Sequence, residues 1–275
     1  MGNYILMDDL YVVDLKTKKV LTKKAFKKGV KDEDSFTKSF FKISDIKIEN
    51  IVAGKRKYTK IKFFPENGEL KPIYVTLNAQ GNIYEYKNEN AKILGDFFLE
   101  ECLDLTKVYI PNVRKMGKAC FFSADSINDI DAKNVEEMGL ACFCCLKSIQ
   151  ELNFPKLKKM RNLCFNAVKK VKALKMRNIE RFGDRCFEHV TTLPNLYFPH
   201  ATKIGYFTFN SLKTVTGRAN IKNVKDIGEG CFDRVTPATD KEPKKNNPEI
   251  GEKRKAEELS IVVGKAKTSA RVRTK

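Results

Sequence analysis

A 22-residue pattern of apolar positions runs through the middle of the 275-residue chain. Five consecutive segments share it from Leu105 onward: LTKVYIPNVRKMGKACFFSADS, INDIDAKNVEEMGLACFCCLKS, IQELNFPKLKKMRNLCFNAVKK, VKALKMRNIERFGDRCFEHVTT and LPNLYFPHATKIGYFTFNSLKT. A sixth segment from Val215 fits once a single inserted residue is allowed, and a degenerate first segment from Ile83 keeps Leu94, Gly95 and Cys102 in phase. The pattern therefore predicts about seven repeat units over residues 83–235.

The aligned segments place apolar side chains in the same columns in every unit. Three of these columns are Leu105, Ile127, Ile149, Val171 and Leu193, then Val108, Ile130, Leu152, Leu174 and Leu196, then Phe121, Phe143, Phe165, Phe187 and Phe209. Val108 and Ile110 are two residues apart, which is the spacing of a strand with one buried face. A unit this short cannot bury such columns alone, so we expect a solenoid, mainly β, with short turns and 3-10 or helical segments.

Glycine recurs just after one apolar column, at Gly117, Gly139, Gly183, Gly205 and Gly228. We expect the coil to change direction there, where a positive φ favours glycine. Arg161 stands at this position in one unit, which indicates that the turn accepts a side chain.

The columns together give the pattern L-x-x-[ILV]-x-[IFM]-P-x-[VLI]-x-x-[MFI]-G-x-x-C-F. This pattern resembles the BspA-like leucine-rich repeat, also called the Treponema pallidum type, whose usual unit is longer by one residue and carries Ala-Phe where this chain has Cys-Phe. The resemblance covers residues 83–235 and implies a right-handed, curved coil that binds other proteins. Members of the family are often surface adhesins, but some are cytoplasmic.

Two further regions flank the repeats. Residues 1–82 are rich in lysine, and DIKIENIV, YTKIKFF and PIYVTL have the composition and alternation of strands. We expect a small β-rich module there that caps the open end of the solenoid. Residues 236–275 contain Pro237, Pro243 and Pro248 among many basic residues, and we expect a flexible basic tail.

Most of the cysteines occupy one column of the repeat. Cys120, Cys142, Cys164, Cys186 and Cys231 directly precede the repeated phenylalanine, and Thr208 holds this position in the fifth unit. Units about 4.8 Å apart place these thiols in a buried row, whereas a zinc ion needs four ligands around one point. Cys144 and Cys145 fall outside the row, and C-x-C-C lacks the spacing of a zinc site. We expect free thiols, with Cys145 facing solvent, and neither a metal nor a cofactor.

The sequence offers little material for catalysis. It has two histidines, His189 and His200, which leaves few candidates for the histidine of a catalytic triad or the histidine pair of a metalloprotease motif. Neither a nucleophile-elbow motif nor a phosphate-binding loop occurs, and Gly228-Glu229-Gly230 falls on a repeat turn. The sequence therefore predicts a protein that is not an enzyme.

Basic residues outnumber acidic ones, with 53 Lys and Arg against 34 Asp and Glu and a formal charge of +19. A positive field attracts nucleic acid, anionic surfaces or acidic proteins without selecting among them. Glu136-Glu137 shares its repeat phase with Arg114-Lys115 and Lys158-Lys159 in the neighbouring units. We expect these pairs to form a charge ladder across units.

Side chains between the buried columns of the repeat strand face outward and form a candidate partner-binding row. It consists of Lys107, Tyr109, Asp129, Asp131, Glu151, Asn153, Lys175, Asn195 and Tyr197. The mixed charge favours a protein partner over a polyphosphate, with Tyr109 and Tyr197 as anchors. We expect this row to line the concave face of the solenoid.

Two functions remain open. The first is non-enzymatic intracellular recognition, as an adaptor or inhibitor that binds a partner protein through the repeat surface. The second is binding of nucleic acid or a ribonucleoprotein through the tail and the N-terminal module, with phosphate contacts from Lys55, Arg56 and Lys57 beside Tyr58 and from Lys23, Lys24, Lys27 and Lys28.

The N-terminal segment bears on where the protein works. It places aspartates inside its apolar stretch and lysines after it, the reverse of a secretory signal, and no stretch approaches the roughly 18 apolar residues of a membrane helix. We therefore expect no membrane insertion and an intracellular protein, in the cytoplasm or the nucleus.

Overall fold

The computed structural model describes residues 43–147, 149–168 and 171–234, together with the backbone of three strands nearer the N-terminus. These strands are β1 (Tyr4–Leu6), β2 (Tyr11–Asp14) and β3 (Lys19–Thr22), and they pair in that order as an antiparallel sheet. The elements assigned in the described part of the chain are strands, and no helix there is long and apolar enough to cross a membrane. The tail and Lys23, Lys24, Lys27 and Lys28 lie outside the described residues.

Four antiparallel strands lead into the repeats, and the last of them lies in the segment predicted as the degenerate first unit. They are β4 (Ile43–Ala53), β5 (Arg56–Pro65), β6 (Ile73–Leu77) and β7 (Ile83–Lys87). The strands predicted from DIKIENIV, YTKIKFF and PIYVTL are thus confirmed as β4, β5 and β6. Burial alternates along β5, where Ile61 and Phe63 are 0% exposed while Lys60 and Lys62 reach solvent, so one face of this sheet packs on the core.

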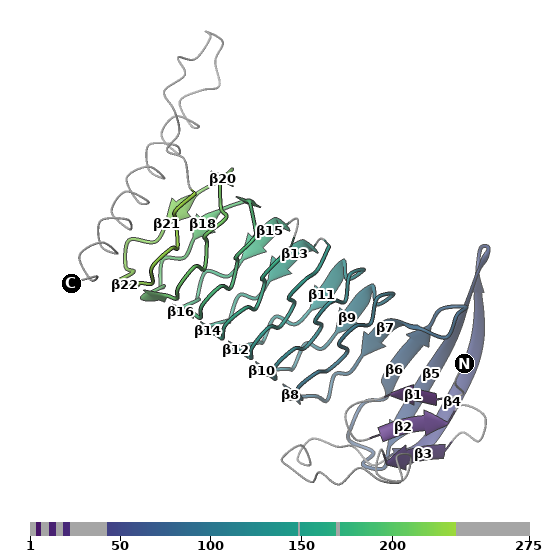
Figure 1. Cartoon of the computed structure of the whole chain (residues 1–275). Coiled ribbons are helices and arrows are strands. Elements are labelled where there is room, and N and C mark those ends of the chain that lie inside the picture. Colours follow the sequence, from purple (N-terminus) through teal and green to yellow (C-terminus); the bar gives the residue numbers. More distant parts are fainter. Residues whose placement is uncertain are drawn as a thin grey trace, which may run out of the picture.

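This antiparallel module continues directly into the repeats (Figure 1). Strand β7 pairs antiparallel with β6 on one side and parallel with β9 (Lys107–Tyr109) on the other. The resulting six-stranded sheet runs in the order β11-β9-β7-β6-β5-β4, with β11 at Asp129–Asp131. The module therefore pairs with the edge that β7 would otherwise leave open.

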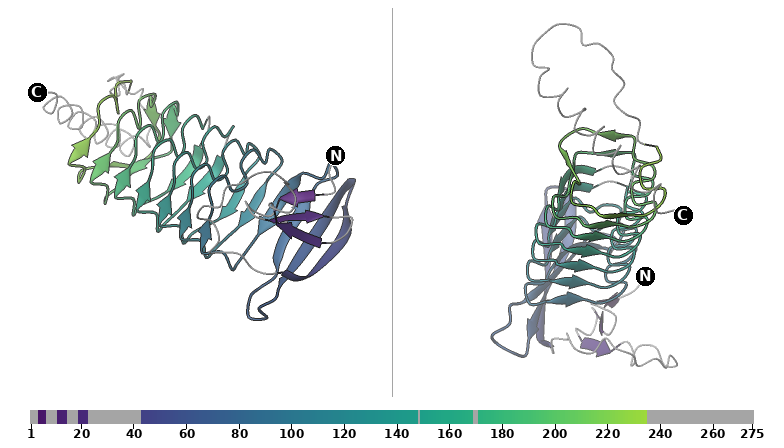
Figure 2. Two further views of the ribbon diagram at one scale, coloured as in Figure 1. Left: turned by 60° about the horizontal axis from the view of Figure 1, so that its bottom comes forward. Right: turned by 90° about the vertical axis from the view of Figure 1, so that its left-hand side faces the viewer.

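Each repeat contributes strands to two sides of a stacked coil (Figures 1 and 2). One side continues from β11 through β13 (Ile149–Asn153), β15 (Val171–Lys175), β17 (Thr192–Leu193), β18 (Leu196–Tyr197), β20 (Thr214–Val215) and β21 (Ala219–Asn220). The other side is one seven-stranded parallel sheet of β8 (Ile93–Leu94), β10 (Lys115–Met116), β12 (Glu137–Met138), β14 (Lys159–Met160), β16 (Arg181–Phe182), β19 (Lys203–Ile204) and β22 (Asp226–Ile227). Met116 pairs with Met138, which in turn pairs with Met160, so each coil returns to the same phase. The predicted solenoid is confirmed.

The insertion predicted in the sixth unit lies between Val215 and Ala219. Leu193 pairs with Val215, whereas Leu196 pairs with Ala219, so the spacing between paired residues grows by one within this segment. Gly217 lies there against the preceding coil, where an added Cβ would come within 2.3 Å of the carbonyl oxygen of Pro194. A glycine therefore lets the longer segment pass without displacing its neighbour.

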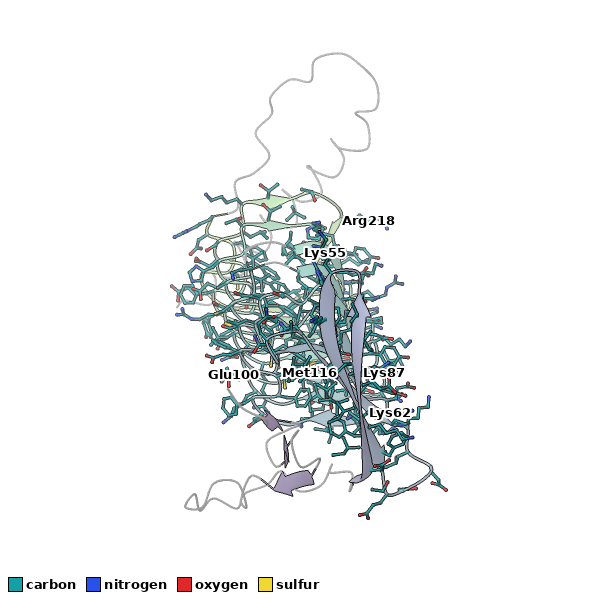
Figure 3. All side chains as sticks on the ribbon, turned by 90° about the vertical axis from the view of Figure 1, so that its right-hand side faces the viewer. Lys55, Lys62, Lys87, Glu100, Met116 and Arg218 are labelled. Atoms are coloured by element: carbon teal, nitrogen blue, oxygen red, sulfur yellow. The ribbon has the colours of Figure 1, made fainter. Side chains whose placement is uncertain are left out.

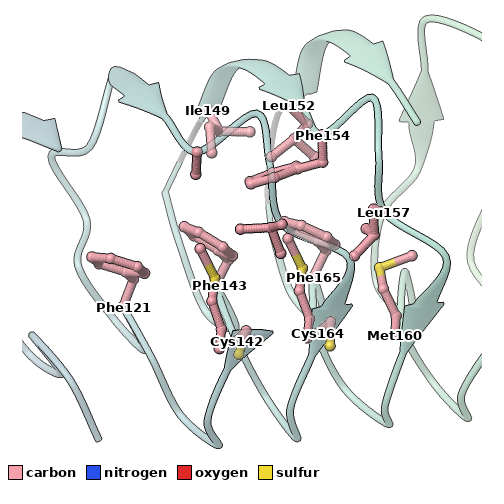
Figure 4. Close-up of a cluster of buried hydrophobic side chains, with 14 of the residues drawn as sticks. Phe121, Cys142, Phe143, Ile149, Leu152, Phe154, Leu157, Met160, Cys164 and Phe165 are labelled. Atoms are coloured by element: carbon pink, nitrogen blue, oxygen red, sulfur yellow. The ribbon is translucent and has the colours of Figure 1, made fainter. Parts of the chain in front are cut away.

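Phenylalanine rings form a continuous stack along the inside of the coil (Figure 4). Phe121, Phe143, Phe165, Phe187 and Phe209 are each 0% exposed. The rings of Phe143 and Phe165 are nearly parallel, with centroids 5.5 Å apart, and the Phe165–Phe187 pair is similar at 5.3 Å. The inward direction predicted for this column is confirmed, and each ring is covered by rings from the coils before and after it.

The repeated glycines lie where successive coils touch. A Cβ on Gly139 would lie 2.4 Å from the carbonyl oxygen of Gly117, and none of the five glycines of this column has a positive φ. The expectation of left-handed backbone at these glycines was therefore wrong. At these five positions the backbones approach too closely for a side chain, whereas the corresponding position of another unit holds Arg161.

Left-handed backbone instead occurs in the following turn, at non-glycine residues. Ala119, Phe121 and Ser123 have φ values of 53°, 60° and 54°, and the corresponding residues of other units behave similarly. A helix needs a run of residues with the same right-handed dihedral angles. Alternating left-handed residues prevent such a run, so the 3-10 or helical segments expected from the sequence are turns.

Polar side chains join the coils on the outside. Glu137 lies between Lys115 and Lys159, with N–O distances of 3.9 and 3.7 Å, and this confirms the charge ladder predicted from the repeat phase. At another corner the amide of Asn134 donates a hydrogen bond to the carbonyl oxygen of Pro111 at 2.6 Å, one coil back. The charge ladder and this hydrogen bond both join neighbouring coils in register.

Candidate interaction surface

Two rows of side chains cross from the N-terminal module to the repeats on the solvent side of the six-stranded sheet. Strand register places the first row as Lys62, Tyr74, Lys87, Tyr109 and Asp131 and the second as Lys60, Thr76, Glu85, Lys107 and Asp129. Lys62, Lys87 and Arg218 lie on one side of the molecule, and Glu100 lies on the other (Figure 3). We refer to these two rows as the crossing rows.

Lysine and aromatic side chains alternate along the first crossing row. The Nζ atom of Lys87 lies 5.8 Å from the ring centroid of Tyr74 and 4.8 Å from that of Tyr109. Lys60 and Lys62 also lie over Tyr74, at 5.1 and 5.5 Å. Cation–π contacts of this kind are each worth about 0.5–1 kcal/mol at an exposed site, and together they hold flexible lysines in place.

The crossing rows enclose a shallow hollow with a volume of about 460 Å³. Its lining includes Lys60, Tyr74, Thr76, Glu85, Tyr86, Lys87, Lys107, Val108, Tyr109, Asp129 and Asp131. Aromatic rings, ammonium groups and carboxylates therefore converge on one place where the module meets the first repeats. A concave site with a few fixed polar groups is typical of a binding site.

Ion pairs divide this surface into differently charged parts. Glu85 pairs with Lys107 at 3.1 Å, and this contact raises the pKa of the lysine. Lys71 and Lys87 both donate hydrogen bonds to Glu89 and hold the pKa of that carboxyl below its usual range.

The two halves of the surface differ in charge. The half on the N-terminal module presents ammonium groups, and the half on the first repeats presents carboxylates. Lys47, Lys60 and Lys62 form cation–π contacts but no ion pair within the described part of the chain. Beyond Tyr109 the rows carry the carboxylates of Asp129 and Asp131, of which Asp131 pairs with Lys133 at 3.7 Å. A partner therefore meets unneutralised ammonium groups on the module and carboxylates on the first repeats.

The rest of the predicted row continues along the later repeats. Glu151 pairs with Lys175 at 2.6 Å, and the half-buried Asn153 lies opposite Lys175 in the strand register. Tyr197 is covered in part by the guanidinium group of Arg218, 5.7 Å from the ring centroid. Asn195 serves the fold instead, because its amide donates to the carbonyl oxygen of Leu174 at 2.9 Å.

The basic hairpin predicted at Lys55, Arg56 and Lys57 stands apart from the hollow. Gly54, with a φ of 62°, makes the tip, and the three basic side chains are exposed. Pairing of β5 with β6 begins only at Thr59, so the end of the β4–β5 hairpin projects beyond the sheet. The ring of Tyr58 packs against that of Tyr84, with centroids 5.0 Å apart, and so connects the hairpin to β7.

Sequence reasoning missed Lys60, Lys62, Tyr74 and Lys87 as members of this surface. The signal was present as alternation, since Lys60 and Lys62 are two residues apart on a strand whose other face is buried. What the repeat pattern could not show is the pairing of β6 with β7, which brings these side chains beside Lys107 and Tyr109.

The cysteine column has a role that size alone does not explain. The thiol of Cys164 donates to the carbonyl oxygen of Gly139 at 3.0 Å, and Cys231 donates to that of Gly205 at 2.8 Å. Burial raises the pKa of the Cys164 thiol and raises that of Cys231 to about 12. Within residues 43–147, 149–168 and 171–234, no three His, Cys, Asp or Glu side chains are grouped so as to hold a metal ion.

Parallel coils with an internal phenylalanine stack define the class of protein as a repeat solenoid. Comparison with family models gives a match to the BspA type leucine rich repeat region, in six copies over residues 84–172 and 158–254. The match spans more than half of the chain, and the protein belongs to this family. A comparison with curated proteins gives no match.

Proposed function

We propose that this protein is a non-enzymatic, intracellular recognition protein that binds another protein through the solvent-facing side of its six-stranded sheet. The observation that carries the proposal is the continuity of the crossing rows, which place Tyr74 and Tyr109 around one hollow at the junction of module and repeats. Tyrosine combines a large apolar ring with a polar tip and is enriched where interfaces bind most strongly. Repeat solenoids commonly bind their partners through an extended surface of this kind.

The charge pattern specifies what the partner must present. Acidic groups on the partner would face Lys60 and Lys62, and a basic group would face Asp129. Complementary charge of this kind chiefly sets specificity and the association rate. A partner of uniform charge would be attracted to one half of the surface and repelled by the other.

The test is affinity purification with the full chain and with variants of the hollow. Tyr109→Ala combined with Asp129→Lys removes one anchor and reverses one charge, and we expect it to lower capture of a specific partner at least tenfold. Tyr206→Ala is the control, because Tyr206 is an exposed tyrosine outside the crossing rows, 56% exposed against 37% for Tyr109. Equal capture by both variants would refute the proposal.

Nucleic acid is the second candidate, and one observation favours it. Lys47, Lys60 and Lys62 surround Phe64 and Tyr74 on an open sheet face, and aromatic rings beside cations can stack bases and hold phosphates. The projecting Lys55, Arg56 and Lys57 would add phosphate contacts.

Salt dependence separates the two candidates. If single-stranded RNA binds here, the logarithm of the affinity falls with the logarithm of salt concentration at a slope of about −0.7 for each phosphate contacted. Changing Lys60 and Lys62 to Gln would then flatten this slope, whereas Lys159→Gln on the opposite sheet would not. A slope near zero for the unmodified chain would exclude this candidate.

A further inference from the structure

The turn of the repeat that begins at Ile127 holds two adjacent thiols side by side. The Sγ atoms of Cys144 and Cys145 are 3.0 Å apart. Cys144 is 6% exposed, whereas Cys145 is exposed and free. The other cysteines of this unit and its neighbours differ, because Cys142 and Cys164 turn inward and donate to backbone carbonyls.

The backbone holds this pair in place from both sides. The carbonyl oxygen of Cys144 accepts a hydrogen bond from the N–H of Ser123 at 3.0 Å, and the N–H of Cys145 donates to the carbonyl oxygen of Asn166 at 2.8 Å. Cys145 has a φ of 66°, a conformation that recurs at this phase at Ser123 and His189. The peptide between the two cysteines is therefore fixed by the coils before and after it, and the site is preorganised.

The spacing suits a bridging atom better than a direct sulfur–sulfur bond. Adjacent Cα atoms are about 3.8 Å apart across a trans peptide, below the range of about 4.4–6.8 Å for ordinary disulfides. One atom bonded to both sulfurs at about 2.3 Å, a usual metal–thiolate length, would subtend an angle of roughly 80° at the observed separation. Such an angle is too narrow for a linear two-coordinate ion.

We propose that Cys144 and Cys145 form a chelating dithiol site for trivalent arsenic, as arsenite or an organic arsenoxide. Trivalent arsenic is thiophilic, and its lone pair compresses its bond angles toward a right angle, so two sulfurs at this spacing suit it. The third ligand comes from the arsenical itself, because Cys142 is fully buried and its thiol is already hydrogen-bonded to Gly117. A tetrahedral zinc ion, by contrast, would need two more protein ligands.

The reaction requires no oxidant. With an arsenoxide, two As–S bonds form, the As–O bond breaks, and the two thiol protons leave with the oxygen as one molecule of water. The oxidation state of arsenic and of both sulfurs stays the same. Cys145 reacts first because it is exposed, and Cys144 then closes the ring.

The test uses the reduced full chain and phenylarsine oxide, followed by native mass spectrometry in excess glutathione. We expect one phenylarsenic group per chain, resistant to the monothiol and removed by a dithiol such as 2,3-dimercaptopropanol. Cys145→Ser leaves a single thiol and should weaken retention at least about a hundredfold, since the second bond gains from its effective concentration. Because Cys145 is exposed, this variant is expected to keep its fold.

The control is Cys102→Ser, which removes a partly buried thiol outside the pair and should leave retention unchanged. Peptide mapping of the adduct should place it on the segment that contains residues 144 and 145. Removal of the group by glutathione from the unmodified chain, or full retention in Cys145→Ser, would overturn the proposal. A group mapped to the buried cysteine column would do the same.

Discussion

The thiol of Cys142 donates a hydrogen bond to the carbonyl oxygen of Gly117 in the preceding coil, at 2.9 Å. The same bond recurs in other repeats, and in one of them Thr208 makes it with its hydroxyl, 2.7 Å from the carbonyl oxygen of Gly183. The glycine column and the cysteine column are therefore parts of one joint. Glycine allows the close approach, and the next coil's small donor satisfies the carbonyl group that the approach buries.

This joint predicts the effect of changing Thr208. Thr208→Val keeps the shape of the side chain but leaves the buried Gly183 carbonyl without its donor, so we expect a loss of about 1–3 kcal/mol in the free energy of unfolding. Urea unfolding measures it. Thr208→Ser keeps the hydroxyl and should lose less, and equal losses for Val and Ser would show that the hydrogen bond contributes nothing.

The close approach predicts that Gly139→Ala is strongly destabilising. The added methyl group would lie 2.4 Å from the Gly117 carbonyl oxygen, which belongs to backbone and cannot rotate away. We expect a loss of about 3 kcal/mol, seen as a lower urea midpoint. Gly68→Ala is the control, because no atom lies within 4 Å of its Cβ position, and it should change stability by no more than about 0.5 kcal/mol. A tolerated Gly139→Ala would contradict this account of the column.

The ring stack predicts the cost of removing one phenylalanine from its middle. Phe165 contacts the rings of Phe143 and Phe187 and is 0% exposed, so Phe165→Ala should lower the free energy of unfolding by about 3–5 kcal/mol. Phe97→Ala removes a ring that is 46% exposed and should cost less than about 1 kcal/mol. Thermal and urea unfolding of both variants make the comparison. Similar losses would mean that the stack is not the core of the coil.

Buried thiols predict a loss of stability at alkaline pH. Burial raises the pKa of Cys231 to about 12, whereas an unfolded thiol ionises near pH 8.5, so above that pH the unfolded chain releases a proton that the folded chain keeps. The contribution of this thiol is complete below about pH 8.5 and falls by about 1.4 kcal/mol per pH unit as the pH rises toward 12.

The check is urea unfolding at several pH values between 8 and 10.5. Cys231→Thr introduces the side chain that Thr208 provides one unit earlier. It should reduce the fall of the free energy of unfolding with pH by the contribution of this one thiol. Thr208→Ser adds no titrating group and should shift stability equally at each pH. An unchanged slope in Cys231→Thr would show that this thiol ionises as easily in the folded protein as in the unfolded one.

Much of the solenoid follows from the sequence alone. The recurrence of Phe121, Phe143 and Phe165 every 22 residues predicts stacked coils, because a chain that returns to the same phase buries the same column each time. The inserted residue after Val215 and the charge ladder around Glu137 were also visible as phase relationships. These features depend on spacing along the chain, and aligning the repeat units of the sequence reveals that spacing directly.

The crossing rows and the glycine column were decided by tertiary structure. The pairing of β6 with β7 joins segments without sequence similarity and brings Tyr74 beside Lys87 and Tyr109. At Gly139, the sequence pattern predicted a positive φ, whereas steric contact between coils, not the backbone dihedral angle, is the reason for glycine. Periodicity reports which side chains are buried, whereas the distance between two backbones and the neighbours of a non-repeating strand depend on how the whole chain packs.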